Sequence, residues 1–384
     1  MELLEQQYNR YRKYLEIDPE NNQLLAQTIE LGLKSGEVQG AWELAQDAMN
    51  RFPEDYSCRY QAVTAALASH HYTDVIQWLS DIISSSPAPV WAQYNYAYAL
   101  FQIGKFDSVI DYVTTVLKQA VPVPRIELIM ARSLHFKGYY SEGASVMSSF
   151  LNDHPGDPEA LGVMSLLFLD MNATERAEKA AEEALCKDGG QVEALLAMAA
   201  IQWAQRNHQK ASALIDKALT IAPSVGRALS IKGQLLLAEG NHLNAMKVFE
   251  LAVKSIPSHI GTWHGLAWCY LFTDQFEKCR EAFEAALELD RNFAESHGGL
   301  ALIAHIMRDE HEVNEHLERA LRLDRSCFTG LFVQAMLLRD NGKNEEADII
   351  IDSILAATPS GEVLPLKEIA EDIIRRMIEQ SDDE

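Results

Sequence analysis

The sequence predicts an all-α protein made of consecutive 34-residue units, each consisting of a helix, a turn and a second helix. Three observations support this fold class: prolines recur at multiples of 34 residues, small residues recur at two fixed places in each unit, and glycines interrupt the middle of many units. Such an array has no single central core, so a chain of 384 residues need not divide into two or three compact domains.

Prolines set the length of the unit. Multiples of 34 residues separate the following prolines, with no insertion or deletion between them: Pro19, Pro53, Pro87, Pro155, Pro223, Pro257 and Pro359. Proline cannot continue a helix, so its place marks the end of the second helix. With the first unit beginning at Asn22, ten units run to Gly361, and they start at residues 22, 56, 90, 124, 158, 192, 226, 260, 294 and 328.

Small side chains occupy positions 8 and 20 of the units. Position 8 is alanine in six units, and position 20 is alanine or glycine in six. Two helices must approach closely at these positions, because large side chains there would push the backbones apart. Between the helices, glycine is expected to supply the left-handed residue that ends the first helix, at Gly36, Gly104, Gly240 and Gly342.

This pattern resembles the tetratricopeptide repeat family over about nine tenths of the chain. The unit at 260–293 carries the residues typical of the family: Trp263, Leu266, Ala267, Tyr270, Phe283 and Ala286. The resemblance implies a right-handed superhelical α-solenoid of about ten helix-turn-helix repeats. It also implies that the first helices line a concave groove, which binds a peptide or a segment of a partner protein.

The two ends of the array are expected to be covered by helices, since an uncovered end would expose half of a core. Residues 1–21 read as an N-terminal capping helix, and residues 362–379 read as a C-terminal capping helix with Leu366, Ile369 and Ile373 on its apolar side. Residues 380–384 form an acidic tail. The C-terminal helix could instead join two copies as a homodimer, although covering the last repeat is its simpler use.

Charge and composition exclude several classes of function. The chain has 33 basic and 56 acidic residues, a net charge of −23, which disfavours binding to DNA, RNA or anionic lipid. No apolar stretch reaches 18 residues, so no membrane insertion is expected, and the first residues lack the features of a secretory signal. The five cysteines are sparse and are expected to be reduced and buried, which favours a cytoplasmic location.

Patterns that carry catalytic or cofactor chemistry are missing from the sequence. It contains no glycine-rich phosphate loop, no Gly-x-Ser-x-Gly and no zinc-type spacing, so we expect no enzyme activity, no cofactor and no metal. The nearest metal-like cluster is His305, His311 and His316 with neighbouring glutamates. His311 and His316 are five residues apart, about 140° around a helix, so polar residues at a turn are the simpler interpretation.

Positions 2, 5, 9 and 12 of each first helix share the face expected to line the groove. The predicted partner-binding residues are five aromatic side chains of the second and third repeats and three basic side chains of the fourth: Tyr60, Trp91, Tyr94, Tyr98, Phe101, Arg125, Arg132 and His135. The rings would hold apolar side chains of the partner, and the arginines would pair with a carboxylate. The alternative is that the rings pack on neighbouring helices.

A second, weaker candidate for a binding surface comprises Trp203, His264 and Trp268, for which interior packing is the favoured interpretation. The sequence therefore predicts a non-catalytic adaptor or scaffold that binds a partner protein. One alternative is a chaperone-like carrier of a secreted or membrane-associated client. Another is a regulatory protein that binds single-stranded nucleic acid or a small ligand, which the net charge disfavours.

Overall fold

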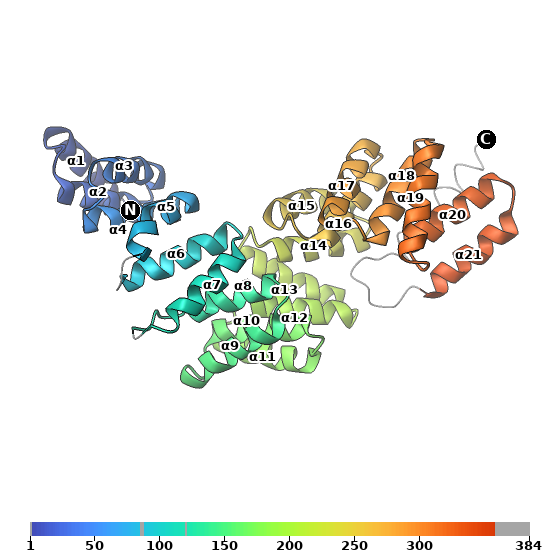
Figure 1. Cartoon of the computed structure of the whole chain (residues 1–384), viewed down its shortest axis with the longest axis horizontal. Helices are drawn as coiled ribbons and strands as arrows, with labels where there is room; N and C mark the ends of the chain where they lie inside the picture. The colour runs from blue at the N-terminus through green and yellow to red at the C-terminus, as the bar shows by residue number, and fades with distance from the viewer. Residues whose placement is uncertain (1, 85–87, 120, 358–384) are drawn as a thin grey trace. The chain divides into compact units, whose positions relative to one another are not determined.

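The computed structural model describes residues 2–84, 88–119 and 121–357 (Figure 1), and these residues form twenty-one α-helices without a β-strand. The prediction of an all-α solenoid of paired helices is confirmed. Twenty-one helices correspond to one leading helix followed by ten helix pairs. The expected C-terminal capping helix, its role in a homodimer and the acidic tail lie outside the described residues.

The chain divides into two compact units, residues 1–172 and 173–384. The first unit contains ten helices: α1 (Glu2–Ile17), α2 (Asn22–Ser35), α3 (Val38–Arg51), α4 (Tyr56–Ala68), α5 (Tyr72–Ser84), α6 (Val90–Gln102), α7 (Phe106–Val116), α8 (Ile126–Phe136), α9 (Tyr140–Asp153) and α10 (Pro158–Asp170). After the leading helix α1, even-numbered helices are the first helices of the repeats.

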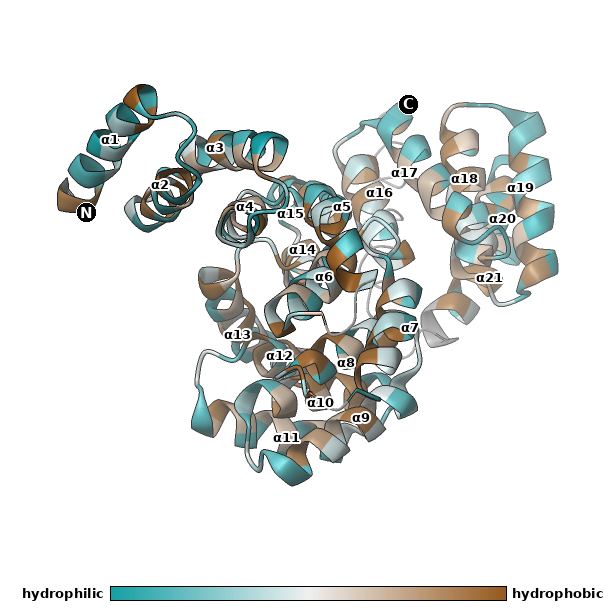
Figure 2. Cartoon of the chain, turned by 60° about the vertical axis from the view of Figure 1, so that its left-hand side comes forward, coloured by the Kyte–Doolittle hydropathy of each residue, from teal (hydrophilic) through white to brown (hydrophobic). Residues whose placement is uncertain are grey.

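The second unit contains eleven helices: α11 (Thr174–Lys187), α12 (Val192–Ala204), α13 (His208–Ile221), α14 (Gly226–Ala238), α15 (His242–Ser255), α16 (Ile260–Phe272), α17 (Phe276–Leu289), α18 (Ala294–Ile306), α19 (Glu310–Leu323), α20 (Phe328–Asp340) and α21 (Asn344–Ala357). The first and second helices of a repeat differ in hydropathy. The first helix α18 is almost continuously buried, whereas the second helix α19 buries only Val313 and Ala320 and carries many hydrophilic residues, drawn in teal (Figure 2).

The starts of several first helices are fixed by side chains of the preceding loop. Asn21, Asp55 and Asp157 each accept a hydrogen bond from a backbone N–H at the start of the following helix. These caps satisfy N–H groups that have no partner within the helix. Asp55 also accepts a 2.8 Å hydrogen bond from the side chain of Asn22, which links the starts of two successive repeats.

The turn between the two helices has one backbone conformation at position 15 of all ten repeats. The predicted left-handed glycines are confirmed at Gly36, Gly104, Gly240 and Gly342, and Gly138 adopts the same conformation. Five other residues take the same place with φ between 57° and 61°: His70, Asn172, Arg206, Asp274 and Arg308. The geometry of the helix pair therefore requires this conformation whether or not the residue is glycine.

Close packing at positions 8 and 20 is confirmed, since these side chains are buried throughout the array. The ring of Phe249 on α15 illustrates the reason. It lies against Gly233 of its own repeat and against Gly265 of the next, so that a Cβ atom on Gly233 would come within 2.8 Å of the ring. One fully buried ring thus fills the space between three helices of two repeats.

The leading helix α1 packs on the first repeat through Tyr8, whose ring lies against Gly32 and Gly40 and is 2% exposed. Four cysteines are buried as expected, but Cys186 is exposed, because it lies on the outer side of α11. None of the helices in the described residues is both long and apolar enough to cross a membrane.

Candidate functional site

The predicted aromatic residues of the second and third repeats lie together on α4 and α6 of the first unit. We call the six rings Tyr56, Tyr60, Trp91, Tyr94, Tyr98 and Phe101 the aromatic surface. Tyr56 and Tyr60 are 60% and 39% exposed, and the four rings on α6 are half-buried. The rings are therefore neither sealed in the interior nor fully exposed to solvent.

Trp91 is held between the two tyrosines of α4. Its ring meets Tyr56 and Tyr60 edge-on, at centroid distances of 5.8 and 5.0 Å. The Trp91 indole N–H donates a 2.7 Å hydrogen bond to the hydroxyl oxygen of Tyr56. This hydrogen bond fixes the orientation of the indole and uses its single donor.

Tyr94 and Tyr98 are one helical turn apart on α6. Their rings are parallel within 7°, with centroids 6.5 Å apart, and Tyr72 of α5 meets Tyr98 edge-on. Burial is the main cause of the raised pKa of the Tyr94 hydroxyl, and the negative charge of the Glu159 carboxylate raises this pKa further. The Tyr94 hydroxyl therefore stays protonated and able to donate a hydrogen bond at neutral pH.

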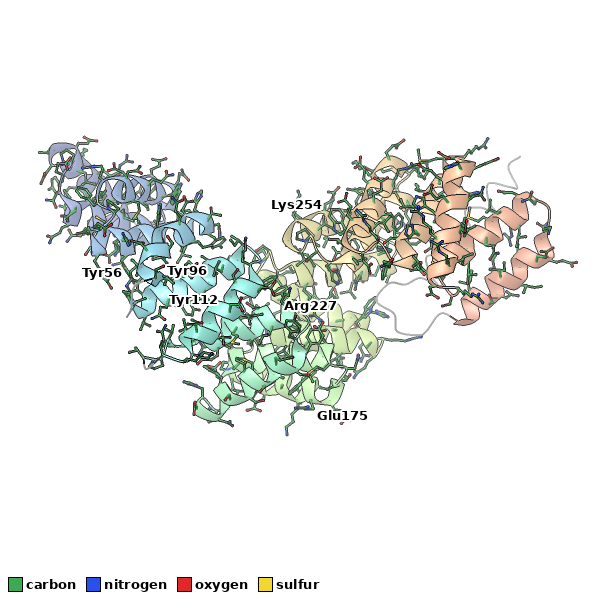
Figure 3. The ribbon with its side chains drawn as sticks, in the orientation of Figure 1. Tyr56, Tyr96, Tyr112, Glu175, Arg227 and Lys254 are labelled. Carbon is green, nitrogen blue, oxygen red and sulfur yellow. The ribbon has the colours of Figure 1, made fainter. Side chains whose placement is uncertain are left out.

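Phe101 is the last ring of the aromatic surface and lies near the end of α6. It packs against Phe106 and Phe136, whose rings are stacked at 4.8 Å. Phe136 is 55% exposed. By contrast, Tyr96 on the other side of α6 packs edge-on against Tyr112 of α7 and serves the interior of the repeat (Figure 3).

The basic residues of the fourth repeat are paired with acidic residues of the next repeat. Arg125 donates a 2.7 Å hydrogen bond to Asp157 and also contacts Glu159, which lies 2.8 Å from Arg132. His135 contacts Asp170 at 2.6 Å. The expected positive spot is thus neutralised, which corrects the prediction that these arginines are available for a partner carboxylate.

The carboxylates of this ion-pair network are stabilised in their charged form. Burial alone would raise the pKa of Asp157, but the hydrogen bond from Arg125 and one from the backbone N–H of Ala160 lower it below its ordinary value. Burial likewise opposes the charge of Glu159, and Arg132 and Arg125 lower its pKa overall. The network therefore holds α8 and α10 together at neutral pH.

Two residues of the second candidate surface, His264 and Trp268, lie in the interior, the interpretation that the sequence favoured. Trp268 is 1% exposed and packs edge-on against Phe283, and His264 is 4% exposed with Nε2 2.9 Å from the hydroxyl of Ser296. Both side chains belong to the interior between helices, so neither can contact a partner. Trp203 is half-buried and meets His208 edge-on. The structure does not bring Trp203 into ring contact with the other two.

The histidines of the metal-like cluster are also separated. His305 approaches Asp340, whereas Nδ1 of His316 lies 3.0 Å from Nδ1 of His297. In the part of the chain that the structure describes, no three His, Cys, Asp or Glu side chains gather as metal ligands do.

Some residues of the site were missed from the sequence. Tyr56 is at position 1 of its repeat, next to the groove-facing position 2, and Phe136 is at position 13. Glu159 occupies position 2, the position of Arg125 one repeat earlier. Comparing equal positions of consecutive repeats would have indicated this ion pair, because such positions lie side by side in a stacked array.

The paired helices define a helical-repeat protein, and its first unit carries a row of partly exposed rings on α4 and α6. Models of the tetratricopeptide repeat match residues 163–226, 196–260 and 236–303. The 34-residue helix pairs extend the same pattern through the rest of the described chain. The family matches and the repeated helix pairs together support a tetratricopeptide-repeat protein.

Two relatives share part of the chain. Protein O-mannosyl-transferase TMTC1 of Homo sapiens is 25% identical over 159 residues, 40% of this chain and 18% of that protein. Anaphase-promoting complex subunit 3 of Schizosaccharomyces pombe is 23% identical over 155 residues, 40% of this chain and 23% of that protein. The chain thus spans about a fifth of the length of these relatives.

Solved structures resemble the chain over most of its length. A monomeric mutant of IFIT1 with Gppp-AAAA has a TM-score of 0.54 and 13% identity, over 87% of this chain and 90% of that one. The Cut9–Hcn1 hetero-tetramer of APC/C has a TM-score of 0.50 and 13% identity, over 97% of this chain and 94% of the matched chain. These likenesses show the fold alone.

Proposed function

We propose that this chain is a non-catalytic scaffold of the cytoplasm that binds a segment of a partner protein on the aromatic surface. The tetratricopeptide fold supports an interaction role in general, and the observation that carries the specific proposal is the set of six partly exposed rings on α4 and α6. Complete burial of one such ring stabilises a complex by about 1.5–3 kcal/mol relative to leaving it in water.

The ion-pair network has a positioning role in this proposal. Arg125, Arg132 and His135 connect α8 to carboxylates at and around α10, beside the aromatic surface. Their pairing fixes the spacing of the neighbouring repeats, and the rings then provide the contact with the partner. The partner does not need to supply a carboxylate.

Two forms of the scaffold role remain as proposals: an assembly subunit of a larger complex, and a chaperone-like carrier of a client. The name of the Schizosaccharomyces pombe relative, a subunit of the anaphase-promoting complex, fits the first form.

The test uses twelve-residue peptides selected from a random display library against the whole protein. Peptides that bind the wild type are expected to lose at least tenfold in affinity for the double variant Trp91→Ala/Tyr98→Ala, since tenfold corresponds to about 1.4 kcal/mol. The matched control is Trp263→Ala on α16, another half-buried tryptophan but in the second unit.

Thermal unfolding of both variants separates loss of binding from loss of structure. The proposal requires that the double variant keep the helical content of the wild type and that Trp263→Ala keep its binding. Peptides bound equally well by the wild type and a folded double variant would contradict the proposal.

A further inference from the structure

The rings of the aromatic surface follow α6 in three groups. Trp91 stands with Tyr56 and Tyr60, Tyr94 stands with Tyr98, and Phe101 ends the row. An α-helix rises 1.5 Å per residue, so the row from Trp91 to Phe101 is about 15 Å long. Flat apolar ring faces are thus repeated along a line rather than gathered around one pocket.

Most of these rings also carry a hydroxyl group. Tyr56 Oη accepts the hydrogen bond from Trp91, so its own O–H is left to donate, and its side chain is the most exposed of the set. Tyr60, Tyr94 and Tyr98 add three more hydroxyls along the same row. A surface of this kind combines apolar faces with hydrogen-bond donors.

The formal charge next to the rings is balanced. Arg125 is paired with Asp157 and Glu159, and Glu159 is shared with Arg132. The surface therefore gives no electrostatic reason to select an acidic segment, and its specificity must come from shape and hydrogen bonding.

On the basis of the proposed function, we propose that the occupant of the aromatic surface is a proline-rich segment in the polyproline II conformation. The polyproline II conformation has no internal hydrogen bonds, so the carbonyl oxygens of such a segment are free to accept hydrogen bonds from the tyrosine hydroxyls. Its pyrrolidine rings pack on aromatic faces, and its conformation is already ordered before binding. At 3.1 Å per residue, about five residues span the row from Trp91 to Phe101.

The test presents three peptide libraries of equal size to the whole protein: Pro-x-x-Pro peptides, peptides with helically spaced aromatic residues, and extended peptides without proline. The Pro-x-x-Pro library is expected to supply the binders. Trp91→Ala is expected to weaken them at least tenfold, and Tyr98→Phe, which removes only the hydroxyl, severalfold. Trp263→Ala serves as the control that leaves binding unchanged.

The outcomes separate this inference from the proposed function. If helical or proline-free peptides bind through Trp91 while Pro-x-x-Pro peptides do not, the polyproline inference is overturned and the scaffold proposal stands. If no library supplies a peptide sensitive to Trp91→Ala, both are overturned. Equal binding by wild type and Tyr98→Phe would remove the role of the hydroxyl donors and, with it, the argument for an acceptor-rich ligand.

Discussion

The ring of Phe249 lies against Gly233, close enough that a Cβ atom there would come within 2.8 Å of three ring carbons. The same ring lies even closer to Gly265 at the start of the next repeat. Because Phe249 is completely buried, it cannot move toward solvent to make room for a larger neighbour. The contact between the two repeats therefore requires glycine, which has no side chain, at both Gly233 and Gly265.

Gly265→Ala is expected to destabilise the protein by about 1–3 kcal/mol, because the added methyl group overpacks the contact with Phe249. Urea-induced unfolding followed by circular dichroism measures the change. Gly189→Ala is the control, since a Cβ atom at that position would be at an ordinary distance of 3.6 Å from its nearest neighbour. Equal stability of the two variants would contradict the packing described for Phe249.

Arg308→Gly is expected to stabilise the protein by about 0.5–1 kcal/mol. Arg308 has φ of 61°, a conformation that is costly for a residue with a Cβ atom and natural for glycine. The gain is partly offset because glycine makes the unfolded chain more flexible. Gly240→Ala at the equivalent place of another repeat, with φ of 72°, should have the opposite effect in the same unfolding experiment.

Glu159→Gln is expected to destabilise the protein at pH 7 on the order of 1 kcal/mol, allowing for the solvent that reaches this ion pair. The folded pKa of Glu159 lies below its ordinary value of 4.5. Its stabilising contribution is therefore complete above pH 4.5 and is lost as the pH falls through the folded pKa.

The difference between wild type and Glu159→Gln should therefore shrink as the pH falls below 4.5. Urea unfolding at pH 7 and at the lowest pH where the protein remains folded tests this expectation. The control is Glu175→Gln on α11, because Glu175 is exposed (Figure 3). A difference that is independent of pH would show that the carboxylate charge is not responsible.

His264 is expected to make the protein sensitive to moderate acid. Burial lowers the pKa of His264 from 6.5 to about 4. The folded protein favours the neutral imidazole ring. The free energy of unfolding is therefore highest above pH 6.5, and it decreases by on the order of 3 kcal/mol as the pH falls toward 4.

His264→Gln removes this titration while retaining a polar side chain near Ser296. The free energy of unfolding of the variant should therefore fall less between pH 6.5 and 4.5 than that of the wild type. An identical decrease in both proteins would assign the acid sensitivity to other groups.

The 34-residue spacing predicted the paired helices well, because proline, glycine and small residues act on the local backbone and on contacts between adjacent helices. Gly36 and Gly104 were correctly placed in left-handed turns. Arg206 and Arg308 were not expected there, since their side chains do not favour that conformation. The stacking of whole repeats requires it, and that requirement is not visible in a single residue.

The prediction for the site was more complete for shape than for charge. The row from Trp91 to Phe101 follows directly from helical spacing. The neutralisation of Arg125 does not, because it depends on Asp157 and Glu159, which lie a full repeat later in the chain. His264 and Trp268 have the same spacing as exposed residues of other repeats, and only the neighbouring Phe283 and Phe293 show that this part of the array is filled.

The common conformation at position 15 bears on how such a chain can evolve. Because Gly138, Asn172 and Arg206 turn the backbone in the same way, the connection between helices is interchangeable from one repeat to another. A duplication or loss of one whole 34-residue segment joins ends that already match. The array can therefore change length in units of one repeat without a new connecting loop having to arise.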